Sequence, residues 1–140
     1  MKDLSVENPK APDSFSWSEA PELDVQFNIA ANPVNDEIQE VTLKIAVTAK
    51  TSQGTVYIID LAHCGLVGMR NMAEEQKHAF VFAEAPRFLF PFARRVIADA
   101  TRDAGFQSLV LDPIDFSAVY VQQLQAQQQD PSFAAPPSDA

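Results

Sequence analysis

The sequence predicts an α+β domain in which a four-stranded antiparallel sheet carries two to three helices packed on one face. Alternating apolar and polar residues fill the first half of the 140-residue chain, and helical spacing replaces that alternation after Gly68. Hydrophobic residues make up 46% of the chain, which is sufficient for one core. Strands followed by helices in separate blocks are typical of this fold class.

Four strands are expected in the first half of the chain. Residues 1–8 form a short strand with Leu4 and Val6 on one face. Longer strands follow at residues 23–29, 41–48 and 56–61. Turn-forming residues at 32–36 and 52–54 separate these three strands. The intervening segment 9–21 is rich in Pro, Ser and Ala and is predicted to be a loop, whose Phe15 and Trp17 pin it to the core.

Helices are expected in the second half. Asn71 and Glu74 resemble a capping pair for a helix that runs to about residue 82 and ends at Pro86. A second helix covers residues 89–104, with Pro91 in its first turn and Gly105 as a left-handed cap.

The last helix is expected to begin after Asp115 and to end near Leu124. Residues 1–128 are therefore predicted to form one domain. Residues 129–140 are predicted to be a disordered C-terminal tail, because they offer too little apolar surface to offset the entropy lost on ordering.

Some apolar surface exceeds what one small chain is expected to bury. The helix at residues 89–104 has a wide apolar stripe, and Tyr57, Ile59 and Leu61 are expected on the sheet face away from the helices. This surplus predicts self-association.

Charge and composition limit the possible partners. The formal net charge of −9 disfavours binding to nucleic acid or to an anionic membrane surface, and it favours positively charged partners. The N-terminal residues form no secretory signal, and no apolar run is long enough for direct membrane insertion, so a cytoplasmic location is expected. The single cysteine, Cys64, suits a reducing compartment.

Catalytic and metal sites are not predicted. His63 and Cys64 are neighbours in a strand, so their side chains point to opposite faces and cannot act as a nucleophile–base pair. One cysteine and two histidines, His63 and His78, are too few for a protein-built metal site. An alternative, a small cone-shaped α+β enzyme or ligand carrier, would need polar groups that converge in a deep pocket.

Acidic residues gather on the expected outer side of the sheet. Asp3 and Glu7 belong to the first strand, and Asp60 lies beside Ile58 in the fourth. If these two strands are adjacent, the carboxylates form a flat acidic surface. Such a surface serves either solubility or the docking of a partner.

Three segments resemble the SecB family of protein-export chaperones. Residues 89–94 (LFPFAR) are similar to the family's helix-start motif, and residues 105–116 (GFQSLVLDPIDF) to the signature that follows it. Residues 2–9 (KDLSVENP) resemble its first strand. The similarity extends from about residue 2 to 129 in the same order.

The resemblance implies a molecular chaperone without cofactor or enzymatic activity, assembled as a homotetramer that is a dimer of dimers. Such chaperones bind unfolded precursor proteins in the cytosol, keep them translocation-competent and deliver them to SecA, the motor ATPase of the Sec pathway. The family's SecA contacts fall on Asp3, Glu7, Ile58 and Asp60 of this sequence. A basic, zinc-containing tail of SecA would meet these residues, and the zinc belongs to that partner.

Client binding is expected on apolar surface between the sheet, the loop and the last helix. The candidates are Trp17, Leu23, Val25, Phe27, Leu66, Phe116, Tyr120 and Leu124. Alternation does not show which of them are covered by the core. A dedicated chaperone of a single unstable partner, such as an antitoxin, is the second hypothesis, and client breadth would separate it from a general export chaperone.

Overall fold

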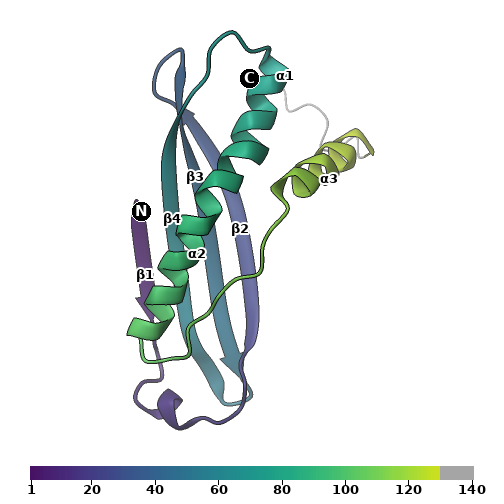
Figure 1. Ribbon diagram of the computed structural model, residues 1–140. Coiled ribbons are helices and arrows are strands. Elements are labelled where there is room, and N and C mark those ends of the chain that lie inside the picture. Colours follow the sequence, from purple (N-terminus) through teal and green to yellow (C-terminus); the bar gives the residue numbers. More distant parts are fainter. Residues whose placement is uncertain (130–140) are drawn as a thin grey trace.

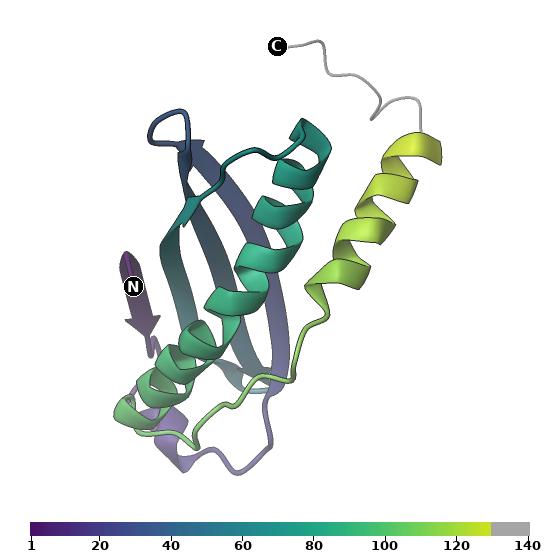
Figure 2. The same cartoon turned by 45° about the horizontal axis from the view of Figure 1, so that its top comes forward.

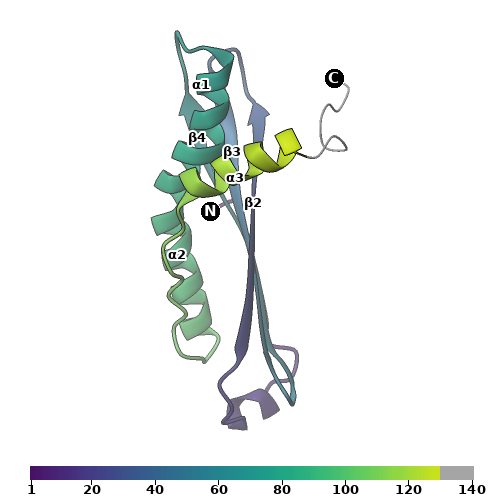
Figure 3. The same ribbon diagram turned by 90° about the vertical axis from the view of Figure 1, so that its right-hand side faces the viewer.

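The computed structural model describes residues 1–129 and contains a four-stranded antiparallel sheet of strand order β1-β4-β3-β2 (Figure 1). The strands are β1 (Asp3–Glu7), β2 (Glu22–Pro33), β3 (Ile38–Thr51) and β4 (Gly54–Gly68). A long helix lies along one side of this sheet (Figure 3). The predicted fold class is therefore confirmed. Of the predicted disordered tail, 129–140, Gln129 is instead the last residue of a helix, and residues 130–140 lie outside the described residues.

Tight turns join the three long strands. At the β2–β3 connection the Asn35 side-chain oxygen accepts hydrogen bonds from the backbone N–H groups of Glu37 and Ile38, at 2.9 and 3.0 Å. This Asx turn satisfies backbone donors that the ladder cannot reach. The loop between β1 and β2 contains a short 3₁₀ helix, η1 (Asp13–Ser16).

The helix-covered side of the sheet, which we call the inner face, carries the core. Every second residue of β3 is at most 2% exposed: Val41, Leu43, Ile45, Val47 and Ala49. Ile59 and Leu61 of β4 pair with Val47 and Ile45 and share that face. The outer face is the opposite side, where Lys44 and Ala46 of β3 are exposed.

One expectation about the two faces is wrong. Tyr57, Ile59 and Leu61 do not lie on the uncovered side, because all three are on the inner face and at most 4% exposed. Residues 56–59 are all apolar, so the sequence does not show which of them point to the inner face. A register shift between Ala49 and Lys50 of the facing strand displaces the pairing as well.

A single continuous helix replaces the two that were expected (Figure 2). It comprises α1 (Glu74–Ala79), a π-helical segment η2 (Phe80–Glu84) and α2 (Ala85–Asp103). The predicted break at Pro86 is wrong, because Pro86 is the second residue after the π-helical segment, where the hydrogen-bond register shifts and a missing N–H is tolerated.

Two details of the same helix also differ from expectation. Pro91 lies inside α2 and not in a first turn. The helix begins one residue after Ala73, whose N–H donates to Gln76 Oε1 at 3.1 Å, so Asn71 is not the cap. Asn71 instead has a φ of 55° in the preceding turn.

The chain after α2 returns along the helix and is fixed by a few polar contacts. Gly105 has the predicted left-handed backbone, with a φ of 98°. The buried Thr101 hydroxyl accepts a hydrogen bond from the Leu109 N–H at 2.9 Å. Asp115 Oδ1 accepts from the Ala118 N–H at 3.1 Å, which confirms the predicted cap of α3 (Phe116–Gln129). The last helix packs beside η2 and extends past the expected end at Leu124.

Candidate protein-binding surfaces

Three carboxylates gather on the outer face where β1 and β4 pair. Asp60 is directly opposite Ser5, so Asp3 and Glu7, two residues to either side of Ser5, are its diagonal neighbours on the same face. Ile58 is opposite Glu7 and half-buried. We call Asp3, Glu7, Ile58 and Asp60 the acidic patch. Within residues 1–129, none of its carboxylates takes part in an ion pair.

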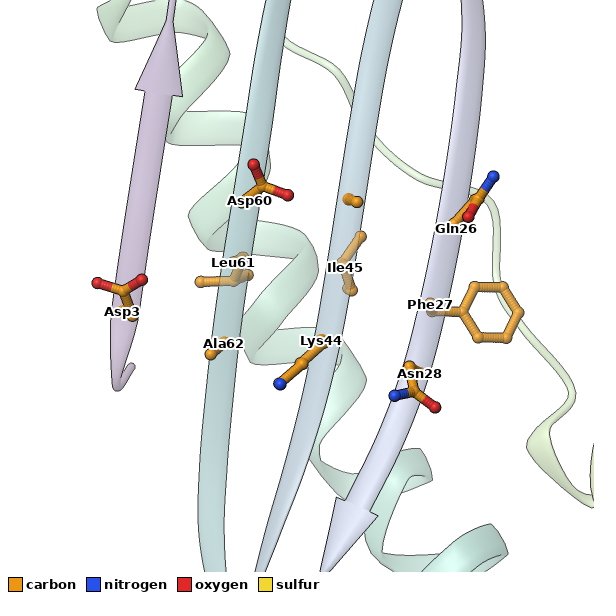
Figure 4. A pocket seen from close by; sticks show the side chains of 10 residues that line it. Asp3, Gln26, Phe27, Asn28, Lys44, Ile45, Asp60, Leu61 and Ala62 are labelled. Carbon is orange, nitrogen blue, oxygen red and sulfur yellow. The ribbon is translucent and has the colours of Figure 1, made fainter.

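A shallow depression of about 340 Å³ adjoins the acidic patch on the outer face. Its floor is low because Ala46 and Ala62, on the two central strands, have short side chains. Figure 4 shows Asp3 and Asp60 on one side of the depression and the amides Gln26 and Asn28 on the other. The depression can receive the stem of a long side chain, and the two carboxylates can bind a positive charge at its end.

A second concave surface, which we call the aromatic cleft, lies where the loop before β2 meets the chain after α2. It has a volume of about 400 Å³. The Phe15 and Phe106 rings stack there with centroids 5.1 Å apart, and Tyr57 lies 5.2 Å from Phe106. Further lining residues are Trp17, Pro21, Leu23, Val56 and Leu109.

Two features determine the shape of the aromatic cleft. Glu19 is tied to the β3–β4 turn by two hydrogen bonds. Its carboxylate accepts one from the Ser52 hydroxyl at 2.6 Å and one from the Ser52 N–H at 3.2 Å. These bonds lower the pKa of Glu19. A Cβ on Gly105 would lie 2.7 Å from Phe15 Cε1, so only glycine allows this approach.

The eight residues expected to bind clients do not form one groove. Trp17 and Leu23 line the aromatic cleft together with Phe15 and Phe106, which were not among the candidates. The sequence could have indicated Phe15 by its proximity to Trp17, and Phe106 by its position directly after Gly105. Leu66 is 70% exposed but lies near the opposite end of β4.

The remaining candidates follow the β2 edge and α3. Val25 and Phe27 are half-buried against the core. Phe116 is only 2% exposed and packs edge-on between Phe27 and Phe90, at centroid distances of 5.9 and 5.8 Å, so it is a core residue. Tyr120 lines a separate pocket between the long helix and α3, and its hydroxyl lies 2.6 Å from His78 Nδ1. Leu124 is half-buried in α3.

The adjacent His63 and Cys64 side chains diverge, as expected. Cys64 Sγ lies 3.1 Å from the Thr42 hydroxyl on the outer face, whereas the His63 ring stacks on Phe92 of α2. No group of three metal-ligating side chains occurs in the described part of the chain. Among those same residues, no helix has the length and apolar character needed to cross a membrane.

A sheet with an acidic patch on its outer face and an aromatic cleft at its end is the kind of surface that suits a protein that binds other polypeptides. Comparison with known proteins gives the family. The family model described as "Preprotein translocase subunit SecB" matches residues 1–127. The chain therefore belongs to the SecB family. It is a protein-export chaperone and not an enzyme, and the prediction from resemblance is confirmed.

Individual relatives agree with this assignment. Protein-export protein SecB of Erythrobacter litoralis is 65% identical over 125 residues, which cover 89% of this chain and 70% of the relative. That of Novosphingobium aromaticivorans is 58% identical over 140 residues, covering 100% and 80%. The hypothesis of a chaperone dedicated to one partner is not favoured.

A solved structure has the same fold. A SecB-like chaperone of Mycobacterium tuberculosis, in complex with a ChAD peptide from the HigA1 antitoxin, superposes with a TM-score of 0.66. The match covers 81% of this chain and 84% of that one at 16% sequence identity. At this identity the likeness supports the fold alone.

Proposed function

We propose that this export chaperone delivers its precursor clients to SecA by docking the acidic patch on the motor protein. The observation that carries the proposal is the cluster of Asp3, Glu7 and Asp60 on neighbouring strands of a rigid face, without ion-pair partners among residues 1–129. Like charges at this spacing repel each other, so a cationic partner gains from all three. Their main contribution is to association rate and specificity.

Removal of these charges tests the docking proposal. The triple variant Asp3→Asn, Glu7→Gln, Asp60→Asn should weaken calorimetric binding of SecA by at least about tenfold and flatten its dependence on salt. A control removes the same charge at exposed carboxylates elsewhere: Asp36→Asn, Glu75→Gln and Asp112→Asn. Equal binding of SecA by the two triple variants would show that net charge, and not the acidic patch, governs docking.

The aromatic cleft is the proposed first contact for unfolded precursors. Its aromatic rings offer non-directional apolar burial, which accepts many sequences. Refolding of a slow-folding precursor should be arrested by excess chaperone and resume when a competing unfolded polypeptide is added. Trp17→Ala should raise the chaperone concentration needed for arrest roughly tenfold, whereas Leu66→Ala, at the far end of β4, should change it little. Unimpaired arrest by Trp17→Ala would move client binding elsewhere.

Self-association to a homotetramer, a dimer of dimers, is also proposed. Phe88 and Phe92, one turn apart on α2, are 59% and 54% exposed. Val6 of the neighbouring edge strand β1 is 38% exposed. An antiparallel β1 from a second copy could pair with this edge and cover the apolar surface beside it. The assembly would meet precursors and SecA in the cytoplasm.

Sedimentation velocity tests the assembly. The wild-type chain should sediment as a tetramer, and Phe88→Ser with Phe92→Ser should give smaller species. Phe15→Ser, at an equally exposed ring of the aromatic cleft, should leave the mass unchanged. A monomeric wild type would refute the proposed assembly without affecting the family assignment.

A further inference from the structure

His63 lies at the margin between the covered and the open part of the inner face. It pairs with the buried Leu43 of β3 and belongs to the same face of the sheet. Its ring is nearly parallel to that of Phe92, with an interplanar angle of 10° and centroids 6.4 Å apart. Phe92 is itself 54% exposed, so His63 forms the inner lining of the apolar surface made by Phe88 and Phe92.

One nitrogen of this histidine has no hydrogen-bond partner. His63 Nδ1 is buried, and no donor or acceptor reaches it within residues 1–129. A neutral ring can leave Nδ1 as an unbonded acceptor at modest cost. A protonated ring would place an N–H donor and a share of positive charge at the same buried position, which is far more costly.

Within residues 1–129, no carboxylate near His63 stabilises a positive charge. Facing His63, β3 contributes the apolar Leu43. On α2, Arg95 follows Phe92 by one turn, and Asp99 further along is paired with Arg102 at 2.7 Å. Burial lowers the pKa of His63.

We propose that His63 makes the association of two copies of this chain through the Phe88–Phe92 surface dependent on pH. This inference rests on the self-association proposed above. A second copy seated on Phe92 removes the remaining water near His63, so that its charged form is disfavoured further. A second copy is the proposed occupant because the unpaired edge of β1 borders this surface, and Phe88 and Phe92 remain exposed in a single chain. Arg87, which lies over the Phe88 ring, is already paired with Glu84 at 3.1 Å.

The direction of the effect follows from proton linkage. Because association lowers the pKa of His63, forming the complex from protonated chains releases protons. Association is strongest above the pKa of the free chain and weakens as the pH falls through it. Each pKa unit by which association lowers His63 corresponds to about a tenfold change in the association constant for each copy of the residue.

Sedimentation velocity over a concentration series at pH 7.5 and 5.5 tests this proposal, with His63→Gln as the variant. The chain has only two histidines, so His78→Gln provides the matched control. Wild type and His78→Gln should associate at least about tenfold more weakly at pH 5.5. His63→Gln should associate nearly equally at both pH values, with an unchanged far-ultraviolet circular dichroism spectrum.

The outcomes separate this inference from the one on which it rests. Association that is present but equal at both pH values, or an unchanged pH dependence in His63→Gln, overturns the role of His63 and leaves the assembly intact. Monomers at every pH overturn both. Nuclear magnetic resonance of the His63 ring gives an independent check that needs no variant. Its titration midpoint should be lower in concentrated than in dilute protein, and equal midpoints would refute the proposal.

Discussion

The two faces of the sheet are made by alternate residues of the same strands, yet they differ in almost every property. On the inner face Leu43, Ile45 and Val47 are almost fully buried beneath α2. On the outer face Lys44 and Ala46, which alternate with them, are exposed, and the acidic patch lies on the neighbouring strands. Burial and surface charge therefore alternate from one position to the next along the chain.

If the acidic patch docks a partner as proposed, this alternation has a mechanical advantage. A docking surface fixed on a paired strand keeps its charges at constant spacing, whereas a surface on loops would have to be ordered at each encounter. The packed inner face keeps the strands in place, and the strands in turn hold the charged side chains of the outer face at a constant spacing. Substitutions at adjacent positions should consequently have very different effects.

The largest contrast is expected between Ile59 and Asp60. Ile59→Ala should lower the free energy of unfolding by about 2–5 kcal/mol, because it leaves a cavity in the core. Asp60→Ala should change it by less than about 0.5 kcal/mol. Urea denaturation of both variants measures the difference. Equal losses would mean that the outer face also contributes substantially to folding.

A buried polar contact sharpens the comparison. Thr101→Val should cost about 1–3 kcal/mol, because the Leu109 N–H loses its only acceptor seen in the described residues. Thr101→Ser keeps the hydroxyl and serves as the control. Hydrogen exchange at the Leu109 amide should accelerate in the valine variant alone. Unchanged protection would show that this bond does not fix the segment after α2.

Added volume should be tolerated on one face only. Ala49→Leu enlarges a fully buried residue of β3 and should destabilise the fold by about 1–3 kcal/mol. Ala46→Leu, three residues earlier on the outer face, should stay within about 0.5 kcal/mol. It should nevertheless fill the depression beside the acidic patch and weaken SecA binding. Thermal denaturation and calorimetry test the two halves of this prediction, and a stability loss in Ala46→Leu would contradict it.

The smallest effect concerns Tyr57, whose burial on the inner face raises its pKa above 10.0. Since the neutral phenol is favoured in the folded state, this contribution is complete below the pKa of the unfolded chain. It is lost as the pH rises towards the folded value. Wild type should therefore lose more stability than Tyr57→Phe between pH 8 and 11, by about 1.4 kcal/mol for each tenfold difference in acid dissociation constant. Parallel losses would exclude a role for this phenol.

The strands and the fold class could be predicted from sequence because alternation and helical spacing directly record which side of an element is buried. The face on which Ile59 lies could not be predicted. The four successive residues 56–59 are all apolar, so no alternation shows which of them point towards the core. The continuation of the helix through Pro86 was also hidden, because helix-breaking rules assume α-helical hydrogen bonds on both sides of a proline.

The candidate binding surfaces were predictable to different degrees. The acidic patch needed only the adjacency of β1 and β4, because residues two apart in a strand always share a face. The apolar candidates depended on which aromatic residues the last helix would cover, and Phe116 proved to be core. The aromatic cleft joins Phe15 to Phe106 across most of the chain, a contact for which local patterns contain no signal.

The π-helical segment also fixes the angular relationship between the two ends of the long helix. Successive residues of an α-helix are rotated by about 100° around its axis, so one residue deleted or inserted within 80–84 would turn α1 by about that angle relative to α2. His78 would swing away from Tyr120, and Val81, which is buried against Val41 of β3, would be displaced as well. A change of one residue in length at this point would therefore rotate α1 by a fixed angle and break its contact with the last helix.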